Sequence, residues 1–241
     1  MNSPALGIGH AGIGIMILLA LVPIFSDTVE QSFLVALFTR VMVFAIAAAG
    51  LNIALGFGGM VSFGHAMYIG LGAYAAAVMQ FHGIESALIQ LLVALAVGAL
   101  CALIIGLCSL RTAGVAFIMI TLAFAQMFYS ALISFAQYGG DEGLSMVRRS
   151  TVPGLDMEDS TVFYYLVFFV LLGCIALVSK LMGSHYGWAL KGCKSNERRM
   201  AALGFDTSWH KLVAYVLSAL FCVIAGFFLA NLFKFASPSY A

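Results

Sequence analysis

Long apolar runs dominate the pattern of hydrophobic and polar positions along the chain. Seven runs fall at about 8–25, 33–56, 60–80, 86–109, 113–137, 161–182 and 212–234. Each is close to the roughly 20 residues that a helix needs to cross a bilayer core of about 30 Å. The runs are continuous, without the strict alternation of a membrane barrel strand. The pattern predicts an all-α, polytopic transmembrane helix bundle of about seven spans, in one domain over residues 1–241.

Composition supports a chain that lies in the lipid bilayer. Hydrophobic residues make up 63% of the sequence, charged residues 9%, and the mean hydropathy is +1.07. The basic residues are not grouped with aromatic residues on any soluble module, so nucleic acid is not an expected partner. The five cysteines include no Cys-x-x-Cys pair, and no G-x-x-x-x-G-K-[ST] motif occurs. We therefore expect no metal, no cofactor, no ATP hydrolysis in this chain and no enzyme activity.

The polar loops predict an orientation. The loop 180–211 carries the basic residues listed below against only two acids, and the positive-inside bias places it in the cytoplasm. The loop 137–160 holds five acids and two arginines, which suits the external side. Counting back puts the N-terminus inside if 33–80 is two full crossings, and outside if its glycine-rich part is re-entrant. The basic residues are Lys180, Lys191, Lys194, Arg198, Arg199 and Lys211.

The segment 51–74, LNIALGFGGMVSFGHAMYIGLGAY, is uncharged but unusually rich in glycine. The cluster of Gly56, Gly58 and Gly59 predicts that the helical run is interrupted there. A second group with small-residue spacing predicts close packing of helix backbones. Packing alone and a break that serves transport are both open interpretations of these glycines. The second group is Gly64, Gly70 and Gly72.

Polar side chains in the same segment are candidates for a translocation path. Ser62 and His65 are three residues apart on one helix face, which Tyr68 extends, and Asn52 precedes the break. In hydrocarbon such groups need partners on other helices or a water-filled path. His65 could equally be a buried structural residue bonded to a neighbouring carbonyl. Arg40 either reaches the membrane surface along its helix or points into a polar passage.

The basic loop contains a second candidate element at about 195–204. Ser195 is a plausible N-cap and Gly204 a fitting residue after the C-terminus of a short amphipathic helix. The helix could rest on the bilayer surface through Met200 and Leu203. Alternatively it could dock into a cytoplasmic partner. The residues assigned to that contact are Asn196, Glu197, Arg198, Arg199, Leu203 and Gly204.

These two segments, in this order, resemble permease subunits of ATP-binding-cassette importers for branched-chain amino acids, in the LivM-like branch. Residues 50–74 are similar to that family's block G-L-N-x-x-x-G-x-x-G-x-x-S-x-G-H-x-x-x-x-G-x-G-A-Y, with twelve positions in register. Residues 139–147 resemble an external T-G-G-x-x-G-L block, with Tyr138 in place of threonine. Residues 186–230 resemble the segment that members present to the ATPase, where Trp188 replaces an arginine and Arg199 an alanine.

The resemblance implies a half-importer in a bacterial inner membrane. The implied partners are a second permease subunit, two cassette ATPases that dock on the loop helix, and a periplasmic or lipoprotein substrate-binding protein. The expected substrate is a branched-chain or similar small amino acid. Family members continue past Ala241 with further spans, so this chain resembles a C-terminally truncated member.

Two other classes stay open on the residues themselves. One is an ATP-independent channel or ion-coupled carrier for a small polar solute such as urea, with His65 as a relay. The other is a membrane-embedded enzyme or a structural assembly subunit, which full packing of Ser62 and His65 would favour.

Overall fold

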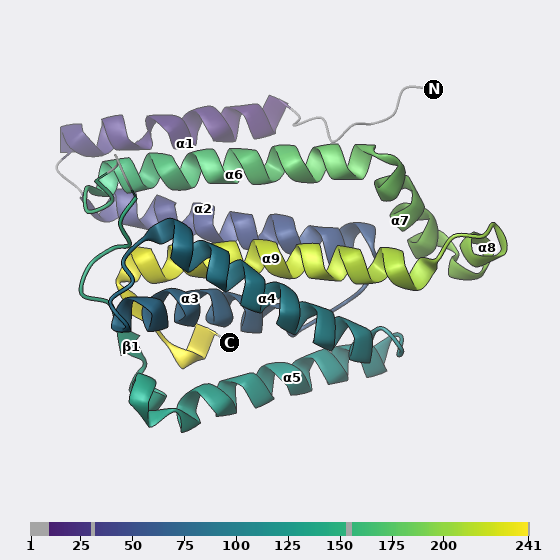
Figure 1. Cartoon of the computed structure of the whole chain (residues 1–241). Coiled ribbons are helices and arrows are strands. Elements are labelled where there is room, and N and C mark those ends of the chain that lie inside the picture. The colour runs from purple at the N-terminus through teal and green to yellow at the C-terminus, as the bar shows by residue number, and fades with distance from the viewer. Residues whose placement is uncertain (1–9, 30–31, 153–155, 241) are drawn as a thin grey trace.

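The computed structural model describes residues 10–29, 32–152 and 156–240, and this part of the chain is almost entirely helical. Long helices lie side by side along one direction (Figure 1). The prediction of an all-α helix bundle with an interrupted glycine-rich segment is confirmed. The long helices are α1 (His10–Val29), α2 (Ser32–Asn52), α3 (His65–Phe81), α4 (Ala87–Ser109), α5 (Val115–Ser134), α6 (Ser160–Gly183) and α9 (Thr207–Phe233).

Five of the seven predicted spans meet the length and hydropathy of a membrane-crossing helix. They are Phe33–Phe57, which joins α2 to the turn that follows it, and the helices α4, α5, α6 and α9. In the part of α1 whose side chains the structure describes, the apolar stretch is Gly14–Pro23, and α3 has 17 residues. The count of seven is therefore not confirmed. Helix α3 is shorter than predicted because the residues just before His65 form the break, although the apolar run 60–80 predicts that they are helical.

Helix α9 forms the centre of the bundle, with 72% of its most apolar window buried. It packs against α2, α3 and α4, whereas α5 lies at the edge with only 17% of its window buried (Figure 1). Glycines allow the close contact between α3 and α9. A Cβ on Gly72 would strike the Val223 carbonyl, and one on Gly226 would strike the Ile69 carbonyl. The α3 and α9 backbones thus touch directly, as expected for membrane helices joined by small residues.

One end of the bundle, here called the β1 end, is closed by a folded loop. Strands β1 (Leu144–Ser145) and β2 (Phe235–Ala236) pair antiparallel there, beside the 3₁₀ turns η2 (Ala136–Tyr138), η3 (Gly140–Glu142) and η4 (Pro238–Tyr240). The Asn231 side chain accepts a bond of 2.8 Å from the Ser150 amide, and the Ser150 hydroxyl donates to Gln90. All three residues are buried, so their hydrogen bonds hold the loop on α4 and α9.

The opposite end, here called the α8 end, carries two short helices that project from the bundle (Figure 1). These are α7 (His185–Ser195) and α8 (Glu197–Ala202), and Asn196 between them is extended. The Asn196 side chain accepts a bond of 3.0 Å from the Arg199 amide and caps α8. The N-cap is therefore Asn196, and the prediction of Ser195 was wrong because Ser195 still belongs to α7. Gly204 follows α8 with φ +89°.

Candidate functional site

The site is built where α2 loses its regular geometry. After Asn52 the backbone forms a π-helical turn, η1 (Ile53–Phe57), and then leaves helix until α3 begins at His65. Gly59 has φ +69°, a conformation that other residues adopt only with strain. Hydrogen bonds from Gly58 to the Ile53 carbonyl and from Met60 to the Ala54 carbonyl close the turn. The chain can thus reverse inside the bundle and place Ser62 and His65 beside α9.

A polar cluster is buried between α3 and α9. His65 and Ser218 share a hydrogen bond of 2.9 Å between Nε2 and Oγ, and the Tyr68 hydroxyl donates to the Tyr215 hydroxyl at 3.2 Å. The His65 ring meets the Tyr215 ring edge-on at 5.4 Å between centroids. Ser62 accepts a bond of 3.3 Å from the Gly64 amide. Three predicted residues, Ser62, His65 and Tyr68, therefore converge.

The cluster is closed in this conformation, with Ser62 and His65 each 6% exposed. A purely structural role for His65 would explain the burial of its Nε2 atom, which is hydrogen-bonded to the Ser218 hydroxyl. It does not account for Nδ1 of the same ring, which is buried without a hydrogen-bond partner in the described structure. A buried polar atom without a partner is costly, so packing alone does not explain the placement of this nitrogen.

A cavity of about 140 Å³ lies beside the cluster, toward the α8 end. Its walls include the break residues 58–61, the connection 112–114 and Lys211. Phe117 also lines the cavity, and its ring meets the Tyr215 ring edge-on at 6.2 Å. Phe117 thus separates the cavity from the polar cluster by one aromatic side chain.

Tyr215 and Ser218 were missed by the sequence reasoning. They lie three residues apart in the apolar run of α9, in the stretch AYVLSAL. That spacing places both on one helix face, as for Ser62 and His65. The signal was present, but nothing in the sequence paired this face with α3.

Two other path candidates do not join the cluster. Asn52 is exposed at the end of α2, where its amide lies against Gly56. Arg40 is exposed on α2, with its guanidinium carbon 5.7 Å from the ring centres of Phe44 and Phe233. Both therefore lie on the surface of the bundle, where Arg40 stacks on aromatic rings.

The predicted small-residue packing holds at several glycines. Gly64 lies against the Thr121 backbone of α5, Gly72 against α9, and Gly70 is buried. At the break, a Cβ on Gly58 would lie 2.7 Å from the Ala54 carbonyl oxygen. Gly58, Gly64 and Gly72 need glycine for close approach, while Gly59 needs it for its positive φ.

The α8 end combines an internal ion pair with exposed side chains. Glu197 pairs with Lys211 of α9 at 2.6 Å, and the hydrogen bond from Lys211 lowers the pKa of the Glu197 carboxyl. Arg198 and Arg199 are exposed, and the structure gives their side chains no ion pair within its described part. Leu203 is 67% exposed. Glu197 therefore holds α8 on α9, and the arginines and Leu203 are the surface available to a partner.

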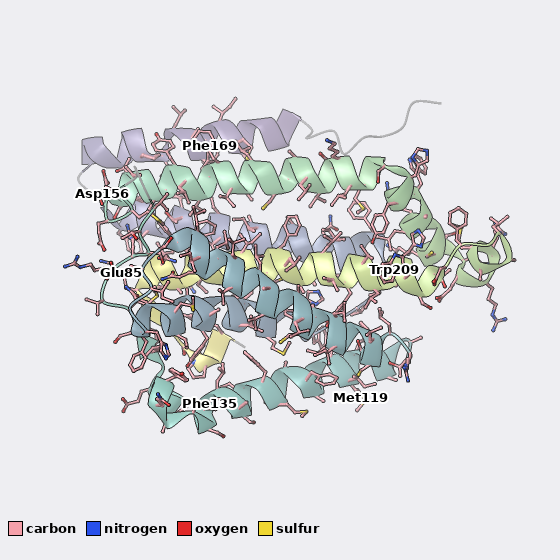
Figure 2. All side chains as sticks on the ribbon, viewed as in Figure 1. Glu85, Met119, Phe135, Asp156, Phe169 and Trp209 are labelled. Atoms are coloured by element: carbon pink, nitrogen blue, oxygen red, sulfur yellow. The ribbon has the colours of Figure 1, made fainter. Side chains whose placement is uncertain are left out.

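The loops at the two ends of the bundle differ in charge: 137–160 holds five acids and two arginines, whereas 180–211 holds six basic residues and two acids. Glu85 and Asp156 lie at the β1 end, and Trp209 lies toward the α8 end (Figure 2). At the β1 end, Lys234 pairs with Glu158 at 2.7 Å, and bonds from Lys234 and Arg149 lower the pKa of the Glu158 carboxyl. No group of three His, Cys, Asp or Glu residues suited to a metal ion occurs among the residues that the structure describes.

The fold and this buried cluster define the chain as a multi-pass helical membrane protein with an interrupted helix at its centre. Residues 33–241 match the family model described as branched-chain amino acid transport system / permease component. The chain belongs to this family of transport permeases.

Two curated relatives are similar to the chain. The high-affinity branched-chain amino acid transport system permease protein LivM of Salmonella typhimurium is 26% identical over 225 residues, and LivM of Escherichia coli is 25% identical over 224. Each alignment covers 83% of this chain and 53% of the relative, so the chain spans about half the length of the curated relatives it matches. No solved structure gives a significant match.

Proposed function

We propose that the chain is a permease subunit of an ATP-binding-cassette importer for branched-chain or similar small amino acids. The observation that carries the proposal is the family match over 33–241, joined to a helix break that buries polar groups in the bundle. Such groups are costly in a membrane and mark pathways for solutes. Broken helices build midplane sites in many transporters. ATP is hydrolysed by separate subunits.

In this proposal the α8 end faces the cytoplasm of a bacterial cell and the β1 end faces outward. The loop 180–211 is the most basic part of the chain, in keeping with the positive-inside bias. It projects from the bundle at the end opposite the acidic loop 137–160, which supports opposite sides for the two loops (Figure 1). The partners are a second permease subunit, two cassette ATPases at α8 and an external substrate-binding protein at the β1 end.

The polar cluster belongs to the translocation path in a closed state. Separation of α3 from α9 would break the bonds of His65 with Ser218 and of Tyr68 with Tyr215, and would leave these groups facing one passage. A small amino acid offers both donors and acceptors, so it can replace the lost bonds. His65 Nδ1, which has no hydrogen-bond partner in the described structure, would offer solute a further contact once the helices separate.

Co-purification with the ATPases tests the docking part of the proposal. The chain is expressed with the ATPase genes, the second permease and the binding protein from its source, and pulled down from detergent. Arg198→Glu and Leu203→Asp are expected to lose the ATPase, because both side chains are exposed on α8. Arg148→Glu at the β1 end is the matched control and should retain it. Retention in all three variants would contradict docking at α8.

Uptake in proteoliposomes tests the path. His65→Ala and Ser62→Ala are expected to reduce uptake of leucine or a similar amino acid while the subunits still assemble. Ser179→Ala is the control, since its hydroxyl is exposed and bonds only within α6. Unchanged uptake in both cluster variants would return these residues to a purely structural role.

A further inference from the structure

The broken end of α2 is held by a lysine from the loop at the α8 end. The Lys194 ammonium of α7 donates a bond of 2.6 Å to the carbonyl oxygen of Gly56. Gly56 lies in η1, where the Gly58 and Met60 amides bond the carbonyls of Ile53 and Ala54 and the Gly56 carbonyl is left for Lys194. A lysine at the C-terminal end of a helix satisfies such carbonyls and complements the helix dipole.

The stem of Lys194 also fits against the break. A Cβ on Gly59 would lie 2.9 Å from Cγ and 3.5 Å from Cδ of Lys194, so the side chain lies across the bare backbone of this glycine. One turn earlier in α7, the Lys191 ammonium lies 5.3 Å from the centre of the Phe57 ring and donates to the Met182 carbonyl at 3.0 Å. Two lysines of α7 therefore contact η1 and the residues just after it.

This contact is not a consequence of chain connectivity. Residues 56 and 194 are 138 positions apart, and α7 is covalently joined to α6 and α8, not to α2. Only Asn196 separates α7 from α8. On the other side, Gly59 is three residues from Ser62 and six from His65. A short physical chain thus leads from the exposed helix α8 through α7 and Lys194 to the buried polar cluster.

We propose that Lys194 is a positioning residue that fixes the broken end of α2 to α7, so that movement of the 180–211 loop displaces the break and, through it, the start of α3. This inference deepens the proposed function, because the source of the movement is the ATPase docked at α8. The link itself is a property of this chain alone. The single hydrogen bond from the Lys194 ammonium to the Gly56 carbonyl oxygen can break and form again without unfolding either helix.

Amide hydrogen exchange on the purified chain in detergent tests the link without any partner. Lys194→Gln removes the charge and shortens the reach, and Lys194→Arg keeps a charged donor. The amides of residues 56–60 are expected to exchange several-fold faster in Lys194→Gln and near the wild-type rate in Lys194→Arg. Lys180→Gln, at the exposed last turn of α6, is the control and should leave these amides unchanged. Equal exchange at 56–60 in the wild type and in Lys194→Gln would overturn the inference.

The assembled importer tests the consequence. Lys194→Gln is expected to bind the ATPases normally and hydrolyse ATP, but to move several-fold fewer solute molecules for each ATP hydrolysed, with recovery in Lys194→Arg. A purely structural role would lower uptake and hydrolysis together. A wild-type ratio in Lys194→Gln would overturn the inference while the proposed function stands. If the wild-type chain binds no ATPase, the proposed function fails and the exchange experiment still decides the link.

Discussion

The contact between α3 and α9 gives the most direct prediction about what holds the bundle together. We consider Gly226→Ala, which adds one methyl group to α9. The added Cβ would lie 2.8 Å from the carbonyl carbon of Ile69 and 3.0 Å from its Cα, besides striking the carbonyl oxygen. These atoms are backbone, so no side-chain rotation relieves the contact. Nonbonded carbons prefer about 3.5–4.0 Å, and the carbonyl oxygen lies closer to the added Cβ than either carbon, so the helices must separate by roughly 1 Å or more.

The cost follows from that separation. Overpacking a close contact typically costs about 1–3 kcal/mol. Alanine is a better helix former than glycine by about 1 kcal/mol, which offsets part of this. The net loss of about 0–2 kcal/mol lowers the melting temperature of a chain of this size by up to roughly 8 °C. The separation also lengthens the bond between His65 and Ser218, so uptake should fall with stability.

Thermal unfolding in detergent, followed by the burial-dependent reactivity of the cysteines, measures the effect. Gly173→Ala is the matched control, because a Cβ at Gly173 of α6 meets nothing within 4 Å. That variant should be as stable as the wild type or slightly more so. The reasoning is refuted if Gly226→Ala melts at the same temperature as Gly173→Ala.

Three further predictions concern the polar contacts. Ser218→Ala removes the partner of His65 Nε2 and should lower stability by about 1–3 kcal/mol, whereas Ser179→Ala should be neutral in the same melting assay. The pKa of the Glu197 carboxyl is lowered in the fold, so its pairing with Lys211 stabilises α8 above the unfolded pKa and is lost as pH falls through the folded pKa. Proteolysis within 196–206 should therefore speed up on acidification in the wild type and depend less on pH in Glu197→Gln. An identical pH profile in the two proteins would contradict the pairing. The Arg149 side chain donates to the Asn231 and Met157 carbonyls, so Arg149→Gln should expose the 144–157 loop to protease. Arg148→Gln removes an exposed side chain and should not have this effect. Equal cleavage in both variants would be contrary evidence.

Much of the fold was predictable because membrane helices leave a strong signal in hydropathy. Runs of apolar residues located α2, α4, α5, α6 and α9, and the glycines at 56–59 located the break. The number of spans was less predictable, since a π-helical turn and a reversal are as apolar as a helix. Helix α3 begins only at His65, after a non-helical stretch that contains Gly59 with φ +69°, and hydropathy does not report such backbone geometry.

The site was only half predictable. Ser62, His65 and Tyr68 lie close together in sequence, so their shared face follows from helical spacing. Tyr215 and Ser218 lie about 150 residues away, and the pairing of α3 with α9 arises from glycine contacts that spacing alone does not assign. Asn52 and Arg40 were predicted to line the path because they are polar, but both lie on exposed faces of α2. Lys194 was counted only as a positive charge, although it contacts the break.

If the polar cluster lines the translocation path, the interface of α3 and α9 must open to solute during transport. Ser218→Cys, in a chain whose five native cysteines are replaced by alanine, places one small thiol at the bond with His65. Labelling by a membrane-impermeant thiol reagent is measured in the assembled importer, at rest and during ATP turnover. We expect little labelling at rest, where Ser218 is buried, and rapid labelling during turnover that an amino acid substrate slows. A complex that transports while this thiol stays unlabelled in both states would contradict the account.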